Sequence, residues 1–193
     1  PAHQAAIADA LRADPRVDFF GRYLRGQGLA GNGCRTLPFV ATGIEPAVEA
    51  RVLSHPVVRR EAADFVKPLR GRLVSQAAEV PGAVGLSAGL AVLLDKPRVH
   101  DEVGPIATYV VPECDSAEAE AQIASDANLQ LAGLTFDGSL GAVDGEVVNV
   151  FHTPSIDTED QTIVTSLPLL QELYGTEDVT FVAVFLHEAG DAT

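Results

Sequence analysis

The hydrophobic pattern of the chain changes near residue 98, and this change constrains the fold more than any other feature. Before it, apolar residues recur at spacings of three and four, the period of an amphipathic helix. After it, short runs of β-branched and aromatic residues are separated by turn residues, as in strands. The pattern predicts an α+β protein with a helical, mildly basic region over residues 1–98 and an acidic α/β region over residues 99–193. The alternative is that the two regions form one continuous domain.

The first region is expected to be helical. Its helices are predicted over residues 2–13, from Asp14-Pro15 to Leu24, and over the long apolar stripe of residues 54–80. The glycine-rich stretch from Gly26 to Gly43 is expected to be a loop. The uncharged stretch Pro81–Leu94 is too short to span a bilayer, so it is interpreted as a buried core element.

The second region has the predicted order β-α-β-β-α-β. The expected elements are strand Ile106–Val111, helix 116–125, strand Leu129–Phe136 with a turn at Asp137-Gly138, a hairpin at Asp144-Gly145 with a strand to Phe151, helix Thr158–Tyr174 ended by Gly175, and strand Val179–Leu186. This order is the ferredoxin-like (βαββαβ) arrangement, so the helical half would pack on a ferredoxin-like mixed sheet. The last strand is apolar on both faces and is therefore expected to be covered.

Charge is distributed as unevenly as the hydrophobic pattern. All 13 Lys and Arg residues precede residue 99, which gives residues 1–98 a net charge of +4 and residues 99–193 a net charge of −18. The total of −14 argues against binding to nucleic acid or to an anionic membrane. The basic stretch 59–72 is expected to meet acidic protein surface, within the chain or in a second copy. The predicted partner is therefore a protein or the chain itself, and a small-molecule ligand is compatible with this interpretation.

The two cysteines predict a reduced, cytoplasmic protein. Cys34 and Cys114 lie 80 residues apart and form no C-x-x-C motif, which does not suggest a disulfide framework. The first residues, Pro1 to Gln4, lack the basic and apolar regions of a secretory signal.

Three short motifs resemble cofactor or metal sites, and each has a simpler explanation. Gly26–Gly31 matches G-x-G-x-x-G, but no predicted strand precedes it and no helix follows, so it is interpreted as a connector. His187–Asp191 resembles a zinc motif, yet it ends a strand and contains Gly190. The acids of Asp157–Asp160 are expected in the first turn of a helix because of its dipole. No cofactor and no metal is predicted.

One group of side chains has the composition of a catalytic site. In the expected sheet the first and third strands are parallel, which would bring Cys114 and His152 to the same edge. A thiol beside an imidazole, with Asp157 orienting the ring, is the pattern of an activated nucleophile. The simpler alternative is a half-buried cysteine beside a surface histidine.

Two functional hypotheses follow. The first is a non-catalytic binding or assembly subunit, which forms homo- or hetero-oligomers through complementary charged and apolar surfaces. The second is a small-molecule enzyme with Cys114, His152 and Asp157 at one edge of the sheet. The sequence leaves open whether the protein is an enzyme.

Overall fold

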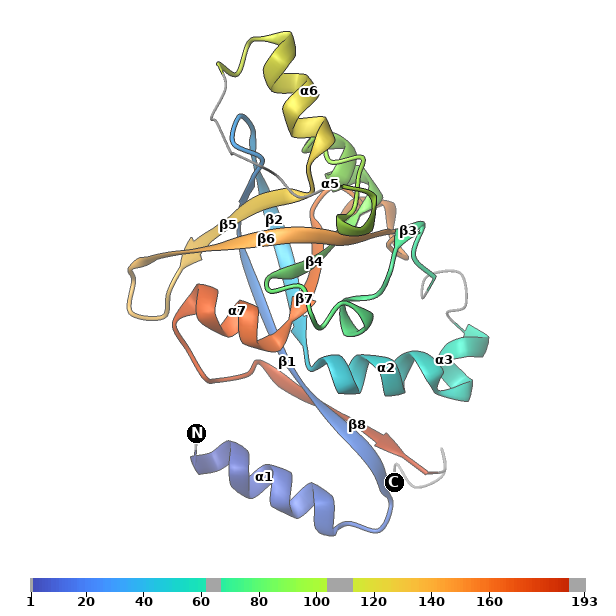
Figure 1. The fold of residues 1–193 in the computed structure, drawn as a ribbon. Helices are drawn as coiled ribbons and strands as arrows, with labels where there is room; N and C mark the ends of the chain where they lie inside the picture. The colour runs from blue at the N-terminus through green and yellow to red at the C-terminus, as the bar shows by residue number, and fades with distance from the viewer. Residues whose placement is uncertain (1, 62–66, 104–112, 188–193) are drawn as a thin grey trace.

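A closed barrel of six β-strands forms the centre of the molecule (Figure 1). The computed structural model describes residues 2–61, 67–103 and 113–187, so the strand expected over 106–111 lies outside the described residues. Around the barrel the strands follow the order β1-β2-β7-β4-β6-β5 and close on β1. They are β1 Val17–Gly31, β2 Thr36–Ile44, β4 Ala83–Ser87, β5 Asn128–Leu134, β6 Leu140–Phe151 and β7 Thr162–Ser166.

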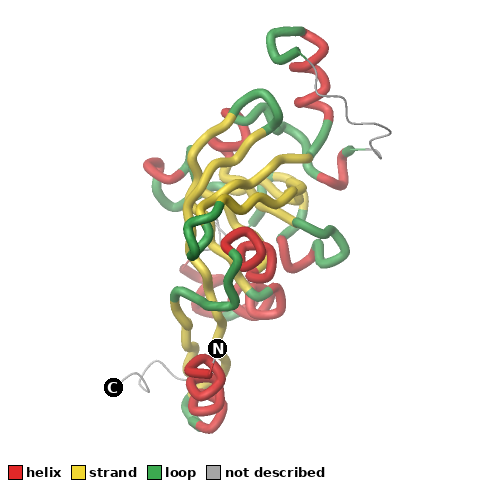
Figure 2. Tube along the Cα trace, turned by 90° about the vertical axis from the view of Figure 1, so that its left-hand side faces the viewer, coloured by secondary structure: helices red, strands yellow, loops and turns green. Residues whose placement is uncertain are grey.

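Short helices and two further strands surround the barrel. The helices are α1 Ala2–Ala13, α2 Pro46–Ser54, α3 Pro56–Glu61, α5 Ala88–Leu93, α6 Ala117–Ser125 and α7 Leu167–Tyr174, with 3-10 turns η1 Val74–Gln76, η2 His100–Glu102 and η3 Ile156–Thr158. The further strands are β3 Arg70–Gly71, which pairs with β6, and β8 Phe181–Leu186, which pairs with β1. Figures 1 and 2 both show α1 and α6 at opposite ends of the molecule.

Strand β1 belongs to the barrel along only part of its length. Its first part, Val17–Tyr23, pairs with β8, whereas Tyr23–Gly31 pairs with β2. Aromatic side chains hold the first part together: the rings of Phe19 and Phe185 stack with centroids 4.3 Å apart. A two-stranded ribbon therefore extends the barrel wall.

Helix α7 supplies much of the barrel core. Its apolar side chains, including Leu167, Leu170 and Leu173, are buried, and the helix contacts β1, β2, β5, β6 and β7. The hydroxyl of Ser166 caps its start by accepting a hydrogen bond from the Leu169 amide. Gly175 ends it with a left-handed backbone conformation. The predicted end at Gly175 is therefore confirmed.

The ferredoxin-like prediction is wrong, because three barrel strands come from the region expected to be helical or looped. Strands β1, β2 and β4 all precede residue 98. The apolar spacing over Val17–Leu24 suggested a helix, but the aromatic and β-branched residues of this segment also suit a strand, and pairing with distant segments decided between the two.

Several local predictions also need correction. Asp144-Gly145 is not a hairpin, because β6 continues through it and pairs with β5 along its length. The helix expected from Thr158 begins only at Leu167, and the β-branched residues before it form β7. The stripe of residues 54–80 is not one helix, since η1 and β3 lie within it. By contrast, α1 and α6 confirm the helices expected over 2–13 and 116–125.

The last strand is an edge strand in the described structure. β8 pairs with β1 on one side, and its side chains Phe181 and Val184 are 37% and 42% exposed. The expectation that both of its faces are covered is therefore not met within the described part of the chain.

Ion pairs join the basic stretch to acids beyond residue 98. Arg72 Nε lies 3.0 Å from Asp101 Oδ2, and Arg70 Nη1 lies 3.5 Å from Glu102 Oε2. These arginines thus meet acidic surface of the same chain, which is one of the two alternatives expected from the charge pattern.

Candidate functional site

The structure does not assemble the catalytic group expected from the sequence. Cys114 forms a disulfide with Cys34, and their Cα atoms are 5.3 Å apart. His152 Nδ1 instead lies 2.6 Å from Glu159 Oε1. Asp157 sits in turn η3, where its backbone carbonyl accepts a hydrogen bond from Gln161. While the disulfide is formed, Cys114 has no thiol that could act as a nucleophile.

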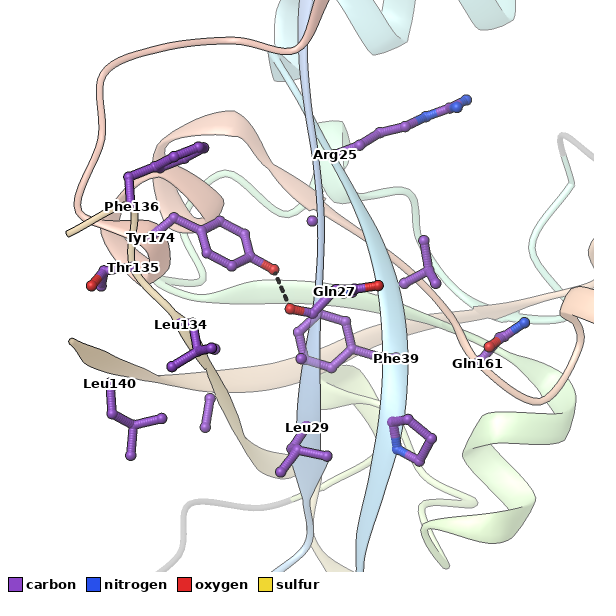
Figure 3. A pocket seen from close by; sticks show the side chains of 16 residues that line it. Arg25, Gln27, Leu29, Phe39, Leu134, Thr135, Phe136, Leu140, Gln161 and Tyr174 are labelled. Carbon is purple, nitrogen blue, oxygen red and sulfur yellow. Dashed lines mark hydrogen bonds between the residues drawn. The ribbon is translucent and has the colours of Figure 1, made fainter. Parts of the chain in front are cut away.

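An opening in the barrel wall lies between β1 and β5. These strands pair only where Leu29–Gly31 faces Gln130–Ala132, and they part beyond that point. A cavity of about 620 Å³ opens there (Figure 3). Its lining comes from β1, β2, β5, β6, α7 and the segments beside them: Arg25, Gly26, Gln27, Gly28, Leu29, Pro38, Phe39, Val40, Ala132, Gly133, Leu134, Thr135, Phe136, Leu140, Gln161 and Tyr174.

Tyr174, the last residue of α7, reaches into this opening. Its hydroxyl donates a hydrogen bond to the backbone carbonyl of Gln27, with an O–O distance of 3.0 Å. Gly26 makes room for the ring, because a Cβ there would lie 2.2 Å from it. Burial raises the pKa of Tyr174 to about 12, so the phenol remains a neutral donor. Gly26 of the glycine-rich motif therefore allows a side chain to approach the strand closely, and the motif is part of β1 and not the connector that was expected.

Five large apolar side chains of the cavity lining are exposed, and we call them the apolar face. Leu134 and Leu140 face each other across β5 and β6, and Leu29 lies opposite both Ala132 on β5 and Pro38 on β2. The exposed fractions are 50% for Leu29, 44% for Val40, 71% for Leu134, 75% for Phe136 and 75% for Leu140. Large exposed apolar patches are common where proteins meet other proteins, membranes or ligands.

Charged residues of both signs lie on the strands and the turn that carry the apolar face. Asp137 follows Phe136 in the turn, Asp144 is exposed on β6 opposite Gln130, and Arg25 lies in the cavity lining. Hydrogen bonds from the Thr135 hydroxyl and the Ser139 amide keep the pKa of Asp137 below its ordinary value, so it is ionised at neutral pH. The one basic side chain in the lining, Arg25, has its guanidinium 5.2 Å from the centre of the Phe181 ring. Figure 3 shows Arg25 pointing away from Tyr174.

The described residues that line this cavity are mostly apolar. Their polar side chains are amides, hydroxyls and Arg25, and they include no carboxylate or imidazole. Among the described residues there is no group of three or more His, Cys, Asp or Glu side chains placed to hold a metal ion. No helix in the described part of the chain is long and apolar enough to cross a membrane.

The apolar face was missed in the sequence, although strand β5 carried a signal for it. Leu129 and Leu131 alternate inward and are buried, whereas Leu134 falls on the other face of the strand. Large apolar residues on both faces of one strand indicate that the second face also meets a partner.

The fold is similar to that of two transporter domains. The extracellular domain of the noncanonic ABC-type transporter YknZ from Gram-positive bacteria matches with a TM-score of 0.51 and 12% identity. The periplasmic region of MacB from Actinobacillus actinomycetemcomitans matches with a TM-score of 0.51 and 9% identity. The matches cover 95% and 96% of this chain, but 73% and 65% of those chains. No protein-family model and no curated protein sequence matches.

Two earlier expectations are corrected by these findings. The similar structures are extracellular or periplasmic domains of ABC-type transporters, and this similarity again contradicts the ferredoxin-like class. The prediction of a reduced, cytoplasmic protein is wrong because both similar structures come from outside the cytoplasm, and because Cys34 and Cys114 form a disulfide. The expectations about nucleic acid and membranes stay predictions.

Proposed function

We propose that this chain is a non-catalytic binding domain that acts outside the cytoplasm and associates with another protein through the apolar face. The observation that carries the proposal is the uncovered state of that face. Leu134, Phe136 and Leu140 are each more than 70% exposed, although they belong to or directly flank the strands of a closed barrel.

Removing the apolar face from water would be energetically favourable. Burying a large apolar side chain that was exposed is favourable by about 1.5–3 kcal/mol. Five such side chains around one cavity form the kind of centre from which interfaces draw most of their affinity. The similarity to domains of ABC-type transporters supports a role within a larger assembly. The enzyme hypothesis is not part of the proposal, because it requires a free Cys114 thiol.

The proposal is tested by photo-crosslinking in living cells. A photo-reactive phenylalanine derivative replaces Leu134 in one variant and Ile156 in a control. Both positions are apolar and highly exposed, at 71% and 88%, but Ile156 is not part of the cavity lining. We expect a discrete protein adduct from position 134 and none from position 156. No adduct at 134, or equal adducts at both positions, would overturn the proposal.

The location outside the cytoplasm is tested separately, by measuring the redox state of the two cysteines. Disulfides persist in oxidising compartments and are rare in the cytosol. Acid quenching of cells followed by alkylation of free thiols should leave Cys34 and Cys114 unmodified until a reductant is added. Complete alkylation without reductant would show a reduced protein, and the extracytoplasmic location would then be rejected.

A further inference from the structure

We infer that the occupant of the apolar face is an amphipathic helix of a different protein, apolar towards the barrel and basic on the flanks of that apolar side. This inference rests on the proposed function and adds the chemistry of the partner. Three properties of the site carry it: its dimensions, its central slot and the sign of the surrounding charge.

The dimensions of the apolar face suit a short helix. Its side chains lie on or beside four neighbouring strands in the order β6-β5-β1-β2. Paired strands are spaced by about 4.8 Å and β1 and β5 part here, so the outer two are at least roughly 14 Å apart. Three turns of an α-helix have a length of about 16 Å. A helix laid on an apolar sheet face is also a common way in which proteins cover such a face.

The slot between β1 and β5 provides a place for one large apolar anchor. It opens where the strands part, and two of its lining residues, Phe39 and Tyr174, are themselves 1% and 5% exposed. The rings of Tyr174 and Phe39 occupy the space beside Gly133 and Gly28, so these two rings form the floor of the slot. An apolar side chain seated in such a pocket loses its contact with water, as the central residues of interfaces do.

The surrounding charge favours a basic partner. No Lys or Arg follows residue 98, so the turn between β5 and β6 and the exposed side of β6 carry only acidic charge, including Asp137 and Asp144, which lie outside the cavity lining. A second copy of the chain also has a net charge of −14, so the two copies would repel each other. An anionic bilayer would be repelled in the same way. Lysine or arginine on the flanks of the helix, next to its apolar side, would instead be attracted to these carboxylates.

The test uses two synthetic peptides of about 18 residues, designed to form helices. Both have the same leucines at positions i, i+3, i+4 and i+7, and the remaining positions are mainly lysine in one and glutamate in the other. Binding to the full, oxidised chain is measured by fluorescence anisotropy. We expect the lysine peptide to bind at least about tenfold more tightly at low salt, with a smaller preference at high salt because the charges are screened.

Variants locate the binding. Leu134→Gln with Leu140→Gln should weaken binding of the lysine peptide at least about tenfold, because it removes the apolar contact. Ile156→Gln removes an equally exposed apolar side chain outside the cavity and should leave binding unchanged. Asp137→Asn with Asp144→Asn should reduce the preference for lysine over glutamate while the apolar contact persists.

Several results would overturn the inference. Equal affinity for the two peptides, or affinity that does not change with Leu134→Gln and Leu140→Gln, would exclude a basic helix on this face. Binding to vesicles of anionic phospholipid that depends on Leu134 would replace the protein partner with a membrane. If the crosslink from position 134 joins two copies of this chain, the binding function stands and this inference fails. If that crosslink does not form at all, the function itself fails.

Discussion

The inner and outer surfaces of the barrel wall are built from the same strands but have opposite relations to solvent. On β5, Leu131 points inward and is completely buried, whereas Leu134 points outward and is 71% exposed. The inner leucine joins a core that includes Leu170 and Ile163. Burial within the chain therefore explains one leucine and leaves the other without a stabilising role in the isolated domain. The difference separates residues that hold the fold from residues available to a partner.

The largest loss of stability is expected from a substitution of the buried residue Lys96. Its Nζ lies 2.5 Å from Asp126 Oδ1 and 3.1 Å from the carbonyl oxygen of Ile123. Burial lowers the pKa of Lys96, and the hydrogen bond to Asp126 opposes that shift. Lys96→Met would leave the Asp126 carboxylate buried without its counter-charge. We expect a loss of about 3–5 kcal/mol in the free energy of unfolding, measured by urea denaturation.

A double variant checks this explanation. Adding Asp126→Asn removes the unpaired charge, so part of the loss should be recovered while the hydrogen bond from the Asn128 amide is kept. If Lys96→Met changes stability by less than about 1 kcal/mol, the pair is not effectively buried, since removing a partner from a buried pair is strongly destabilising.

The second largest loss of stability is expected from a substitution on the inner surface of the barrel. Leu131→Ala should reduce the free energy of unfolding by about 2–5 kcal/mol, because it leaves a cavity in the packed barrel core. Urea denaturation of the oxidised protein measures it. A loss well below about 1 kcal/mol would show that the core around β5 is loosely packed, and the contrast between the two surfaces would then weaken.

The sequence predicted those elements whose signals are local. Helix α6 was expected over residues 116–125, and it spans Ala117–Ser125 with Ser116 as its N-cap. The turn at Asp137-Gly138 was also expected, and Gly138 has a positive φ of 86°. Such features depend on a few neighbouring residues, so they can be predicted without knowledge of the tertiary fold.

The features that were missed depend on residues far apart in the chain. Glycines in Gly26–Gly31 suggested a loop, but Gly26 makes room for the ring of Tyr174 and Gly28 for the backbone of β5 at Ala132. The disulfide joins Cys34 and Cys114 across 80 residues, and no local pattern predicts that pairing. The candidate site was missed for the same reason, since its lining comes from both sides of residue 98.

A smaller loss of stability is expected from a substitution of Tyr174, which lies between the inner and outer surfaces of the barrel wall. Tyr174→Phe removes the hydrogen bond to the Gln27 carbonyl and should cost about 0.5–1.5 kcal/mol at neutral pH. In the folded chain the pKa of Tyr174 is raised from 10.0 to about 12. The unfolded chain therefore loses this proton first, so the stabilising contribution of the tyrosine is present below pH 10 and decreases as the pH rises towards 12.

Urea denaturation at neutral pH and at about pH 11 tests both parts of this prediction, because the second value lies between the two pKa values. The stability advantage of the native protein over Tyr174→Phe should shrink at the higher pH. A constant difference would mean that the Tyr174 hydroxyl is solvated in the folded state, and the opening between β1 and β5 would then be filled with water.

The smallest effect is expected on the outer surface, where Leu134→Gln and Leu140→Gln together should change the free energy of unfolding by no more than about 0.5 kcal/mol. These side chains are 71% and 75% exposed in the folded chain, so unfolding transfers little further apolar area to water. The same urea experiment, with Leu131→Ala as the inner-surface reference, measures the contrast. A loss above about 1 kcal/mol would show that the outer leucines are packed within the chain itself. They would then have a structural role, and the separation between a surface that holds the fold and a surface that binds would no longer apply.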